Sequence, residues 1–381
     1  MRYKSSSLKD LISFISKGIV PKYANSHDKN VIRIINQRCN RNGEITFKEA
    51  RYSDLSKRKV TNEKLLKNKD ILINSTGKGT AGRVAQISEN QLTEPTTVDG
   101  HMIIIRPSEK IDPDYLGYAL KAQQRVIESY AEGSTGQTEI NKQRLLDETI
   151  IKYPSKEEQR KIANIFINLD MKIKNNQKIN TNLFGLSETI FNNILEEETI
   201  KLSEITTIQN GYAFKSSEYI QDEQLMVLRT KNIGINNLFS KDDVVYISKE
   251  NLEKYSKFSF KQFDTVIVMV GASIGRTGFL TSNIVPSLQN QNMWRFRPLN
   301  SKMPGLILYQ YINYINTRVK NSASGSARSF YTKKIFNEFD VPRINTAYYK
   351  TFSKLQEQID NLSKETEELK KIKSILLNEY F

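Results

Sequence analysis

Residues 133–162 read GSTGQTEINKQRLLDETIIKYPSKEEQRKI. A Gly/Ser/Thr loop leads into a short apolar run, Tyr153-Pro154 closes that run, and a charged segment with helical spacing follows. Proline lacks a backbone N–H and disfavours helical geometry in the residue before it, so it separates a strand from the helix that comes next. The stretch therefore predicts a globular part that ends in a strand and continues into a long helix.

A weaker copy of this arrangement lies at residues 324–360, and matches between the two halves of the chain keep an offset of 190 to 194 residues. No single match carries weight, but an unbroken collinear series predicts a tandem duplication. The matched pairs are Leu8–Ile12 with Leu202–Thr206, Gly18 with Gly211, Asp70 with Asp264, Gly82-Arg83 with Gly275-Arg276, Arg106-Pro107 with Arg297-Pro298, Pro113 with Pro304, Gly133-Ser134 with Gly325-Ser326, and Leu169-Asp170 with Ile359-Asp360.

Charge follows the same division. The chain has 381 residues and a formal net charge of +15. Residues 1–152 carry +8 and residues 201–341 carry +7, whereas residues 153–200 carry −1 and residues 342–381 carry +1. The excess of basic residues therefore lies in two globular segments and favours a polyanionic partner.

Short β-rich runs bounded by polar or glycine residues predict strands in both globular segments. Residues 114–133 and 305–325 have helical spacing and end in glycine, so each predicts one helix. The expected fold class is α+β, with globular domains over 1–152 and 201–341. The strand segments are VIRIINQ, DILINST, HMIIIRP, MVLRTKN, DTVIVMV and MWRFRP.

The segments 153–200 and 342–381 each predict a long helix. Their apolar residues recur at three- and four-residue spacing, which is the pattern of a coiled-coil seam. We expect the two helices to pair as an antiparallel spacer, with Asn176 and Asn180 fixing their register; the alternative is two helices that pack independently on their own domains. The expected seam residues are Ile162, Ile165, Leu169, Ile173, Leu183, Leu186, Ile190 and Ile194, and then Phe352, Leu355, Ile359, Leu362, Leu369, Leu376 and Tyr380.

Catalytic signatures are missing from the sequence. GKGTAGRV and GASIGRTG lack the Gly-Lys-Ser/Thr of a phosphate-binding loop, and no GxGxxG follows a strand. His27 and His101 are the only histidines and Cys39 the only cysteine, which leaves no zinc site of usual spacing and no disulfide framework. With no signal peptide or membrane-spanning run, we expect a soluble cytoplasmic binding protein that is not an enzyme.

The opening stretch, extended to GSTGQTEINKQRLLDETIIKYPSKEEQRKIANIFINLD, resembles the junction found in specificity (S) subunits of Type I restriction-modification enzymes. DILINSTGKGTAGRV, its copy DTVIVMVGASIGRTG, and SLQNQNMWRFRP resemble further signatures of that family, and the resemblance covers essentially the whole chain. The second junction departs from the pattern, because TAYYKTFSKLQEQID replaces the Glu-Glu-Gln element.

The resemblance implies two target recognition domains that each read one half of a split double-stranded DNA target, with the helices as a spacer. It also implies two methyltransferase (M) subunits around the helices and added restriction (R) subunits. S-adenosylmethionine would bind M, and ATP and Mg²⁺ would bind R, so this chain would bind no cofactor and no metal. A different class remains open from sequence: a stand-alone two-domain DNA-binding regulator.

Candidate DNA contacts lie in the glycine turns, an amide-rich run, the polar loops and their basic flanks. Each has a structural alternative: a tight turn, a strand-edge role, or an ordinary solvated face. The polar loops could equally contact the M subunit. The candidates are Lys78, Arg83, Arg276, Gln289, Asn290, Gln291, Asn292, Ser134, Thr135, Gln137, Ser326, Arg328, Lys142, Arg144, Lys333 and Lys334.

Candidate subunit contacts lie on the two long helices. They comprise the Glu-Glu-Gln element and apolar positions of the predicted seam. These residues are Glu157, Glu158, Gln159, Ile162, Leu169, Leu355, Ile359 and Leu362.

Overall fold

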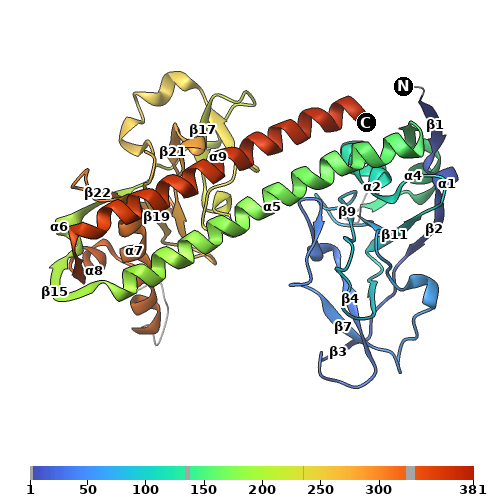
Figure 1. Cartoon of the computed structure of the whole chain (residues 1–381), viewed down its shortest axis with the longest axis horizontal. Helices are drawn as coiled ribbons and strands as arrows, with labels where there is room; N and C mark the ends of the chain where they lie inside the picture. The colour runs from blue at the N-terminus through green and yellow to red at the C-terminus, as the bar shows by residue number, and fades with distance from the viewer. Residues whose placement is uncertain (1–2, 134–137, 235, 323–330) are drawn as a thin grey trace. The chain divides into compact units, whose positions relative to one another are not determined.

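The computed structural model describes residues 3–133, 138–234, 236–322 and 331–381 (Figure 1). The chain divides into two compact units. Unit 1 comprises residues 1–170 and 371–381, and unit 2 comprises residues 171–370. Each unit therefore combines one globular part with segments of both long helices, which is a different division from the four consecutive segments expected from sequence.

Unit 1 is built on a four-stranded antiparallel sheet in the order β2-β11-β8-β9. Its strands are β2 (Ile12–Lys17), β11 (Met102–Pro107), β8 (Ile71–Asn74) and β9 (Val84–Gln86). Alternate side chains of β8 enter two different apolar cores, Ile71 and Ile73 on one face and Leu72 on the other. Burial on both faces explains why these strands read as continuous apolar runs.

Helix α2 (Pro113–Ala122) covers one face of this sheet. Proline occupies its first turn, and the Asp112 carboxylate caps it by accepting from the backbone N–H groups of Asp114 and Tyr115. The helix stops at Gln123, and α3 (Gln124–Ser129) follows. The single helix predicted for residues 114–133 is therefore wrong: the backbone leaves helical geometry at Gln123 and two short helices form.

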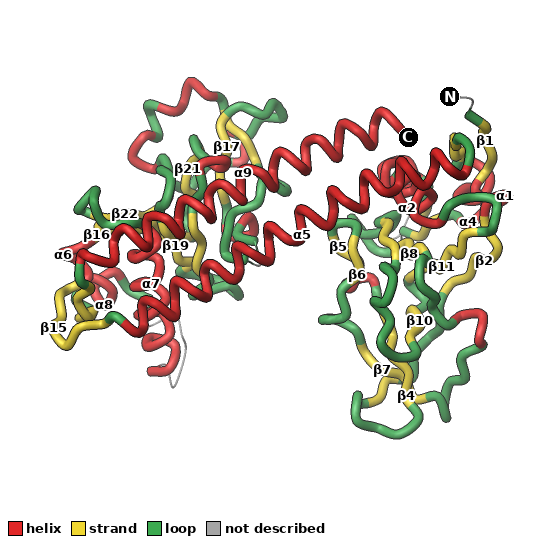
Figure 2. Tube along the Cα trace, viewed as in Figure 1, coloured by secondary structure: helices red, strands yellow, loops and turns green. Residues whose placement is uncertain are grey.

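A second sheet of unit 1 has the order β10-β4-β7-β3 (Figure 2). Its strands are β10 (Thr96–Val98), β4 (Val31–Ile35), β7 (Arg51–Asp54) and β3 (Tyr23–Ala24), and only the β10–β4 pair is parallel. Strand β1 (Lys4–Ser7) pairs with β14 (Ile150–Tyr153), so the beginning of the globular part meets its end just before the first long helix.

Unit 2 repeats this topology, except that its second sheet has three strands instead of four. Its main sheet has the order β16-β22-β19-β20, and a second sheet has the order β18-β17-β21 with β17–β21 parallel. Strand β15 (Leu195–Lys201) pairs with β23 (Asp340–Ile344), as β1 pairs with β14. The remaining strands are β16 (Thr206–Asn210), β22 (Met293–Pro298), β19 (Thr265–Val268), β20 (Thr277–Phe279), β18 (Val245–Ile247), β17 (Leu225–Leu228) and β21 (Ser287–Gln289).

The predicted repeat also holds at the level of single contacts. In unit 1 the Arg106 guanidinium donates two hydrogen bonds of 2.8 and 2.7 Å to the buried Asp70 carboxylate. In unit 2 Arg297 makes the same pair with Asp264 at 2.7 and 2.6 Å. An equivalent bidentate Arg–Asp pair thus stabilises the main sheet of each unit.

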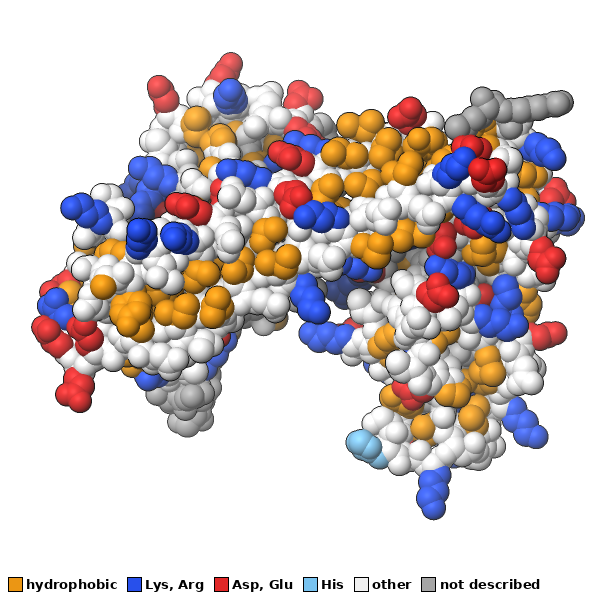
Figure 3. Space-filling view, in the orientation of Figure 1, with side chains coloured by type: hydrophobic (Ala, Val, Ile, Leu, Met, Phe, Trp, Pro, Cys, Tyr) orange, Lys and Arg blue, Asp and Glu red, His pale blue; other side chains and the backbone are white. Residues whose placement is uncertain are grey.

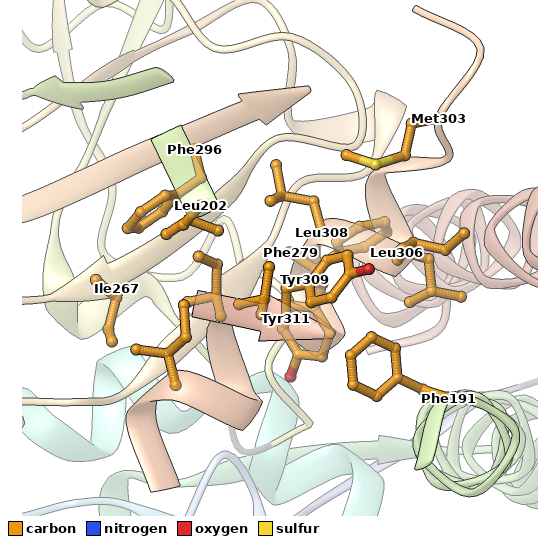
Figure 4. Close-up of a cluster of buried hydrophobic side chains, with 14 of the residues drawn as sticks. Phe191, Leu202, Ile267, Phe279, Phe296, Met303, Leu306, Leu308, Tyr309 and Tyr311 are labelled. Atoms are coloured by element: carbon orange, nitrogen blue, oxygen red, sulfur yellow. The ribbon is translucent and has the colours of Figure 1, made fainter. Parts of the chain in front are cut away.

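The long helices are α5 (Lys156–Asn193) and α9 (Tyr349–Tyr380). Helix α5 follows Pro154 as predicted, but α9 starts later than residue 342 because β23 continues through Pro342 to Ile344. In unit 2, Phe191 of α5 packs on Tyr311 of helix α7 (Gly305–Ser322), with ring centroids 5.0 Å apart (Figure 4). No helix in the described part of the chain is long and apolar enough to cross a membrane.

The buried face of α5 differs from the predicted seam. Ile165 and Leu186 are 38% and 48% exposed, whereas Phe166 and Phe184 are buried. Aromatic side chains have larger apolar surfaces to bury than the neighbouring aliphatic ones. Two of the eight predicted seam positions on α5, Ile165 and Leu186, are therefore exposed, whereas Ile162 and Ile173 are buried as predicted.

Candidate nucleic-acid interface and long helices

The glycine turn of unit 1 follows strand β8. Gly82 has a φ of +86°, and a Cβ there would lie 2.7 Å from the Glu128 backbone. The turn therefore packs directly on α3, and only glycine fits. Arg83 donates to the Gly79 carbonyl at 3.0 Å, which is a turn-stabilising role, while Lys78 at the tip is exposed.

Residues 138–140, which follow the polar loop, are joined to this turn. Gly77 N–H donates to the Thr138 carbonyl at 3.3 Å, and Ile140 N–H donates to the Ser75 carbonyl at 2.7 Å. The turn that carries Lys78 and residues 138–140 thus form one surface. Ser134, Thr135, Gln137, Ser326 and Arg328 lie outside the described residues.

Four polar residues of this surface were not predicted from sequence. His101 Nδ1 lies 2.8 Å from the Thr76 hydroxyl, and Lys17 forms an ion pair with Glu139. Strand pairing brings them together from four separate segments of the chain. A single sequence carries no signal for such pairing.

The equivalent turn of unit 2 is held more tightly. The Gly275 carbonyl accepts from Asn316 Nδ2 at 2.8 Å, and Asn316 in turn bonds the Tyr331 hydroxyl. Arg276 donates to the Gly234 carbonyl at 2.9 Å. The guanidinium groups of Arg276 and Arg83 therefore each bond a backbone carbonyl and stabilise the fold.

The amide-rich run Gln289–Asn292 is mostly structural. Gln289 is fully buried, and its amide donates to the carbonyls of Gln209 and Met293 at 3.0 and 2.7 Å. Asn290 is also buried, and Asn292 is half-buried. Only Gln291 is exposed, because strand β21 and the start of β22 enclose its neighbours.

Some basic residues that follow the polar loops bond other groups of the protein, and others are exposed. Arg144 bonds Glu148 and Glu132, and these contacts raise the pKa of its guanidinium. Lys333 donates to the Ile208 carbonyl at 3.1 Å, and burial lowers the pKa of its ammonium group. Lys142, at the start of α4 (Lys142–Glu148), and Lys334, at the start of α8 (Lys333–Asn337), stay exposed.

Several residues expected at a subunit interface instead lie inside their own unit. Gln159 is buried; its amide oxygen accepts from Asp112 N–H at 2.8 Å and its nitrogen donates to the Pro154 carbonyl at 3.0 Å. These bonds join the start of α5 to the start of α2. Ile162 lies in the unit 1 core, and Leu355 and Ile359 lie in the unit 2 core. For these four residues, burial within the unit contradicts a surface role.

The other four expected interface residues keep some exposure. Glu157 and Glu158 form ion pairs with Lys161 at 2.9 and 3.1 Å, and Lys161 lowers the pKa of Glu157. Leu169 and Leu362 are half-buried.

Exposed apolar side chains lie on α5 and α9 (Figure 3), and two of them, Ile165 and Leu186, were expected in the helix seam. On α5 three of them are spaced by seven or fourteen residues, which keeps them on one face of the helix. The exposed residues are Ile165, Met171, Ile179 and Leu186 on α5, and Ile372 and Ile375 on α9.

Polar contacts link α5 to α9 within each unit. In unit 1 the Asp170 carboxylate accepts from Lys373 Nζ at 2.5 Å and from the Tyr118 hydroxyl at 2.8 Å. In unit 2 Asn176 Nδ2 donates to Glu365 at 2.7 Å, and Lys172 pairs with the same carboxylate at 3.1 Å. Each unit thus holds the two helices together through at least one carboxylate.

The model of one protein family, the Type I restriction modification DNA specificity domain, matches residues 2–183 and again residues 195–375. The chain belongs to this family. The two specificity-domain matches coincide with the two halves of the internal repeat, and each includes most of one long helix.

Relatives of this specificity-domain protein have similar lengths. The Type I restriction enzyme MjaVIII specificity subunit of Methanocaldococcus jannaschii is 24% identical over 351 residues, covering 84% of this chain and 80% of that protein. A putative type I specificity subunit of Mycoplasma genitalium is 25% identical and covers 71% of each. The crystal structure of an M. genitalium Type I S subunit matches with a TM-score of 0.54 and 17% identity over 100% of this chain and 96% of that chain, a likeness of fold.

Proposed function

We propose that this chain is the DNA specificity subunit of a Type I restriction-modification complex. The single observation that carries the proposal is the presence of two DNA specificity domains in one chain, each followed by a long helix. Two domains with the same framework and different intervening residues suit a target in two unlike halves. The chain would act in the cytoplasm by recognition and would catalyse no step itself.

The two long helices would pair as an antiparallel coiled coil that spaces the half-sites. Helix α5 has 38 residues, and at about 1.5 Å per residue it is about 57 Å long. This length corresponds to fewer than about 20 base pairs at 3.4 Å each. Half-sites about one helical turn apart on one face of the duplex fit within that span.

DNA contacts would come from the exposed members of the candidate set. Lys78 is exposed at the tip of a glycine turn, and Lys142 is exposed at the start of a helix that follows the polar loop. In unit 2, Lys334 and Gln291 are exposed. The lysines suit phosphate contacts and the glutamine amide suits a base edge.

Two methyltransferase subunits would pack on the exposed apolar faces of α5 and α9, and restriction subunits would join them. Contiguous apolar surface on a folded chain marks a protein interaction site. Methyl transfer from S-adenosylmethionine would take place on the methyltransferase subunits, with the target adenine flipped out of the duplex. ATP and Mg²⁺ would be used by the restriction subunits.

Methylome sequencing with and without this gene tests the proposal. We expect a single bipartite methylated-adenine motif to disappear when the gene is removed and to return with a plasmid copy. Co-purification should give two methyltransferase subunits per chain. An unchanged methylome together with a chain that binds no methyltransferase would refute the proposed function.

A further inference from the structure

The second sheet of unit 1 ends in a basic surface that includes none of the DNA contacts considered so far. This tip surface consists of six exposed residues on and beside strands β3 and β7, at the end of unit 1 away from helix α1 (Leu8–Leu11) (Figure 1). Residues 20–30 and 51–59 together hold six Lys and Arg residues against two Asp residues, a net charge of +4. The members of the tip surface are Lys22, Tyr23, Arg51, Lys57, Arg58 and Lys59.

The lysine and arginine side chains of the tip surface have few acidic partners. In the part of the chain that the structure describes, Lys22, Arg58 and Lys59 form no ion pair. Lys57 lies 3.4 Å from the Asp54 carboxylate, but the lysine side chain is 70% exposed. An ion pair this open to water is weak, so Lys57 is also available to another anion.

Tyr23 is an exposed aromatic residue among these cations. Its side chain is 56% exposed, and the guanidinium carbon of Arg51 lies 5.0 Å from the centroid of its ring. Antiparallel pairing of β3 with β7 places Tyr23 opposite Ser53 and so fixes it beside Arg51. Lysine, arginine and tyrosine side chains all donate hydrogen bonds to DNA phosphates, so this combination suits a nucleic-acid backbone.

The tip surface adjoins the surface of the glycine turn that carries Lys78. One segment of the chain, residues 17–24, runs from one surface to the other. Lys17, at its start, forms the ion pair with Glu139, and Ile19 forms a β-bridge with Asp99. The segment then enters strand β3. The two surfaces are therefore joined through consecutive residues of the backbone.

Asp99 also connects the two surfaces electrostatically. Its carboxylate accepts from the backbone N–H of His101 at 2.9 Å. Burial raises the pKa of Asp99, and the bond from His101 and then the charges of His101 and Arg51 oppose that rise. Arg51 of the tip surface and His101 of the glycine-turn surface thus both act on one carboxylate.

Unit 2 provides an internal comparison, because its β17–β18 pair corresponds to the β4–β7 pair of unit 1. Val227 pairs with Val245 as Ile34 pairs with Arg51, so an apolar residue stands where unit 1 has an arginine. The equivalent segments 213–224 and 245–253 hold two lysines against five acidic residues, a net charge of −3. A general bias of the chain toward lysine would make both ends basic, so the basic tip is specific to unit 1.

We propose that the tip surface is a second DNA-contact surface of unit 1, which binds the phosphate backbone beside the base pairs that unit 1 reads, and that unit 2 has no counterpart. This inference rests on the proposed function. Lysine and arginine contacts to phosphate raise affinity without reading sequence. The complex would therefore hold its target asymmetrically, with more phosphate contacts beside one half-site than beside the other.

The test is the triple variant Lys57→Ala, Arg58→Ala, Lys59→Ala in the full chain, assembled with its methyltransferase subunits. Each phosphate contact contributes about 0.9 to the slope of log affinity against log salt, so we expect that slope to fall by about 2–3. Hydroxyl-radical footprinting on a duplex with both half-sites should show protection lost beside one half-site only. The methylated motif should stay unchanged, because phosphate contacts carry no sequence information.

The matched control is the triple variant Lys9→Ala, Lys110→Ala, Lys152→Ala. It removes the same charge from exposed positions of unit 1 outside the tip surface, and it should keep the wild-type slope and footprint. All six substituted side chains are exposed, so both variants should keep the wild-type melting temperature. If the tip variant does not accumulate, the single reversal Arg58→Glu replaces it, with an expected fall in slope of about 1.

A tip variant with the wild-type slope and footprint overturns the inference. A control variant that loses as much slope also overturns it, because the effect would then come from total charge. A changed methylated motif would show that the tip surface reads bases, which contradicts a phosphate contact. A wild-type complex that methylates no bipartite motif would instead refute the proposed function, so the two failures are distinguishable.

Discussion

Gly18 and Gly211 occupy the same place in the two units. A Cβ on Gly18 would lie 2.1 Å from the Val98 carbonyl oxygen, and one on Gly211 would lie 2.0 Å from that of Asn290. The neighbouring residue makes the same bond in both units, Ile19 N–H to Val98 and Tyr212 N–H to Gln289. Backbone approach this close leaves no room for any side chain.

Replacing either glycine by alanine should therefore destabilise the protein. We expect Gly18→Ala and Gly211→Ala each to lower the free energy of unfolding by about 1–3 kcal/mol or more, because the backbone must shift. A Cβ on Gly185, inside α5, would instead point into open space, so Gly185→Ala should stabilise by about 0.5–1 kcal/mol. Denaturant titration of the three variants measures these changes, and equal effects at Gly18 and Gly185 would contradict them.

Glu365 gives a prediction with a defined pH dependence. Asn176 and then Lys172 lower its pKa below the ordinary 4.5. A carboxyl whose folded pKa is depressed adds stability above its unfolded pKa, and that stability disappears as pH falls through the folded pKa. Wild type should therefore be more stable than Glu365→Gln at neutral pH, with the difference vanishing in acid. Thermal melts across about pH 3–7 measure it, with the exposed Glu357→Gln as control, and a difference independent of pH would contradict the assignment.

At the scale of elements, the sequence predicted which segments form strands and long helices better than it predicted what they contact. Pro154 and the three-four spacing identified α5, and the continuous apolar run identified β8 as a strand. The break at Gln123 was not predicted. Nor was the burial of Phe166 and Phe184 in place of Ile165 and Leu186, because α2 and α7 decide which face of α5 is covered.

In the candidate site, too, the sequence predicted local features better than long-range contacts. The glycine turns and the basic flanks were found from sequence because local chemistry marks them. The burial of Gln159 and Gln289 was not, since Gln159 bonds a residue 47 positions away and Gln289 one 80 positions away. Hydrogen bonds over such separations leave no local pattern.

The exposed apolar face of α5 gives a prediction for this element. We expect the double variant Ile179→Gln, Leu186→Gln to keep the wild-type melting temperature, because both side chains already meet solvent. It should lose co-purifying methyltransferase subunit. The matched variant Ile173→Gln, whose side chain is buried, should instead lower the melting temperature, by the loss of about 2 kcal/mol or more of core packing. Retained methyltransferase binding in the double variant would place that subunit elsewhere.

At the scale of the whole molecule, net charge distinguishes the globular parts from the long helices. Nearly all of the net +15 belongs to residues 1–152 and 201–341, and the long-helix segments 153–200 and 342–381 are close to neutral. A polyanion is therefore attracted to the globular parts rather than to the long-helix segments. Within those globular parts, Arg83, Arg144 and Arg276 bond other groups of the protein, so we expect exposed lysines to make the phosphate contacts.

Lys78→Ala combined with Lys142→Ala should weaken DNA binding to target and unrelated duplexes alike. Each phosphate contact contributes about 0.9 to the slope of log affinity against log salt, so losing two should reduce that slope by about 2. Titrating the methyltransferase complex with labelled duplex at several salt concentrations measures the slope. Lys161→Ala is the control, because its ammonium group is paired with Glu157 and Glu158 on α5. A slope equal to wild type would place the phosphate contacts of unit 1 away from the glycine turn, whereas a loss restricted to the target duplex would make these lysines readers of sequence rather than of the backbone.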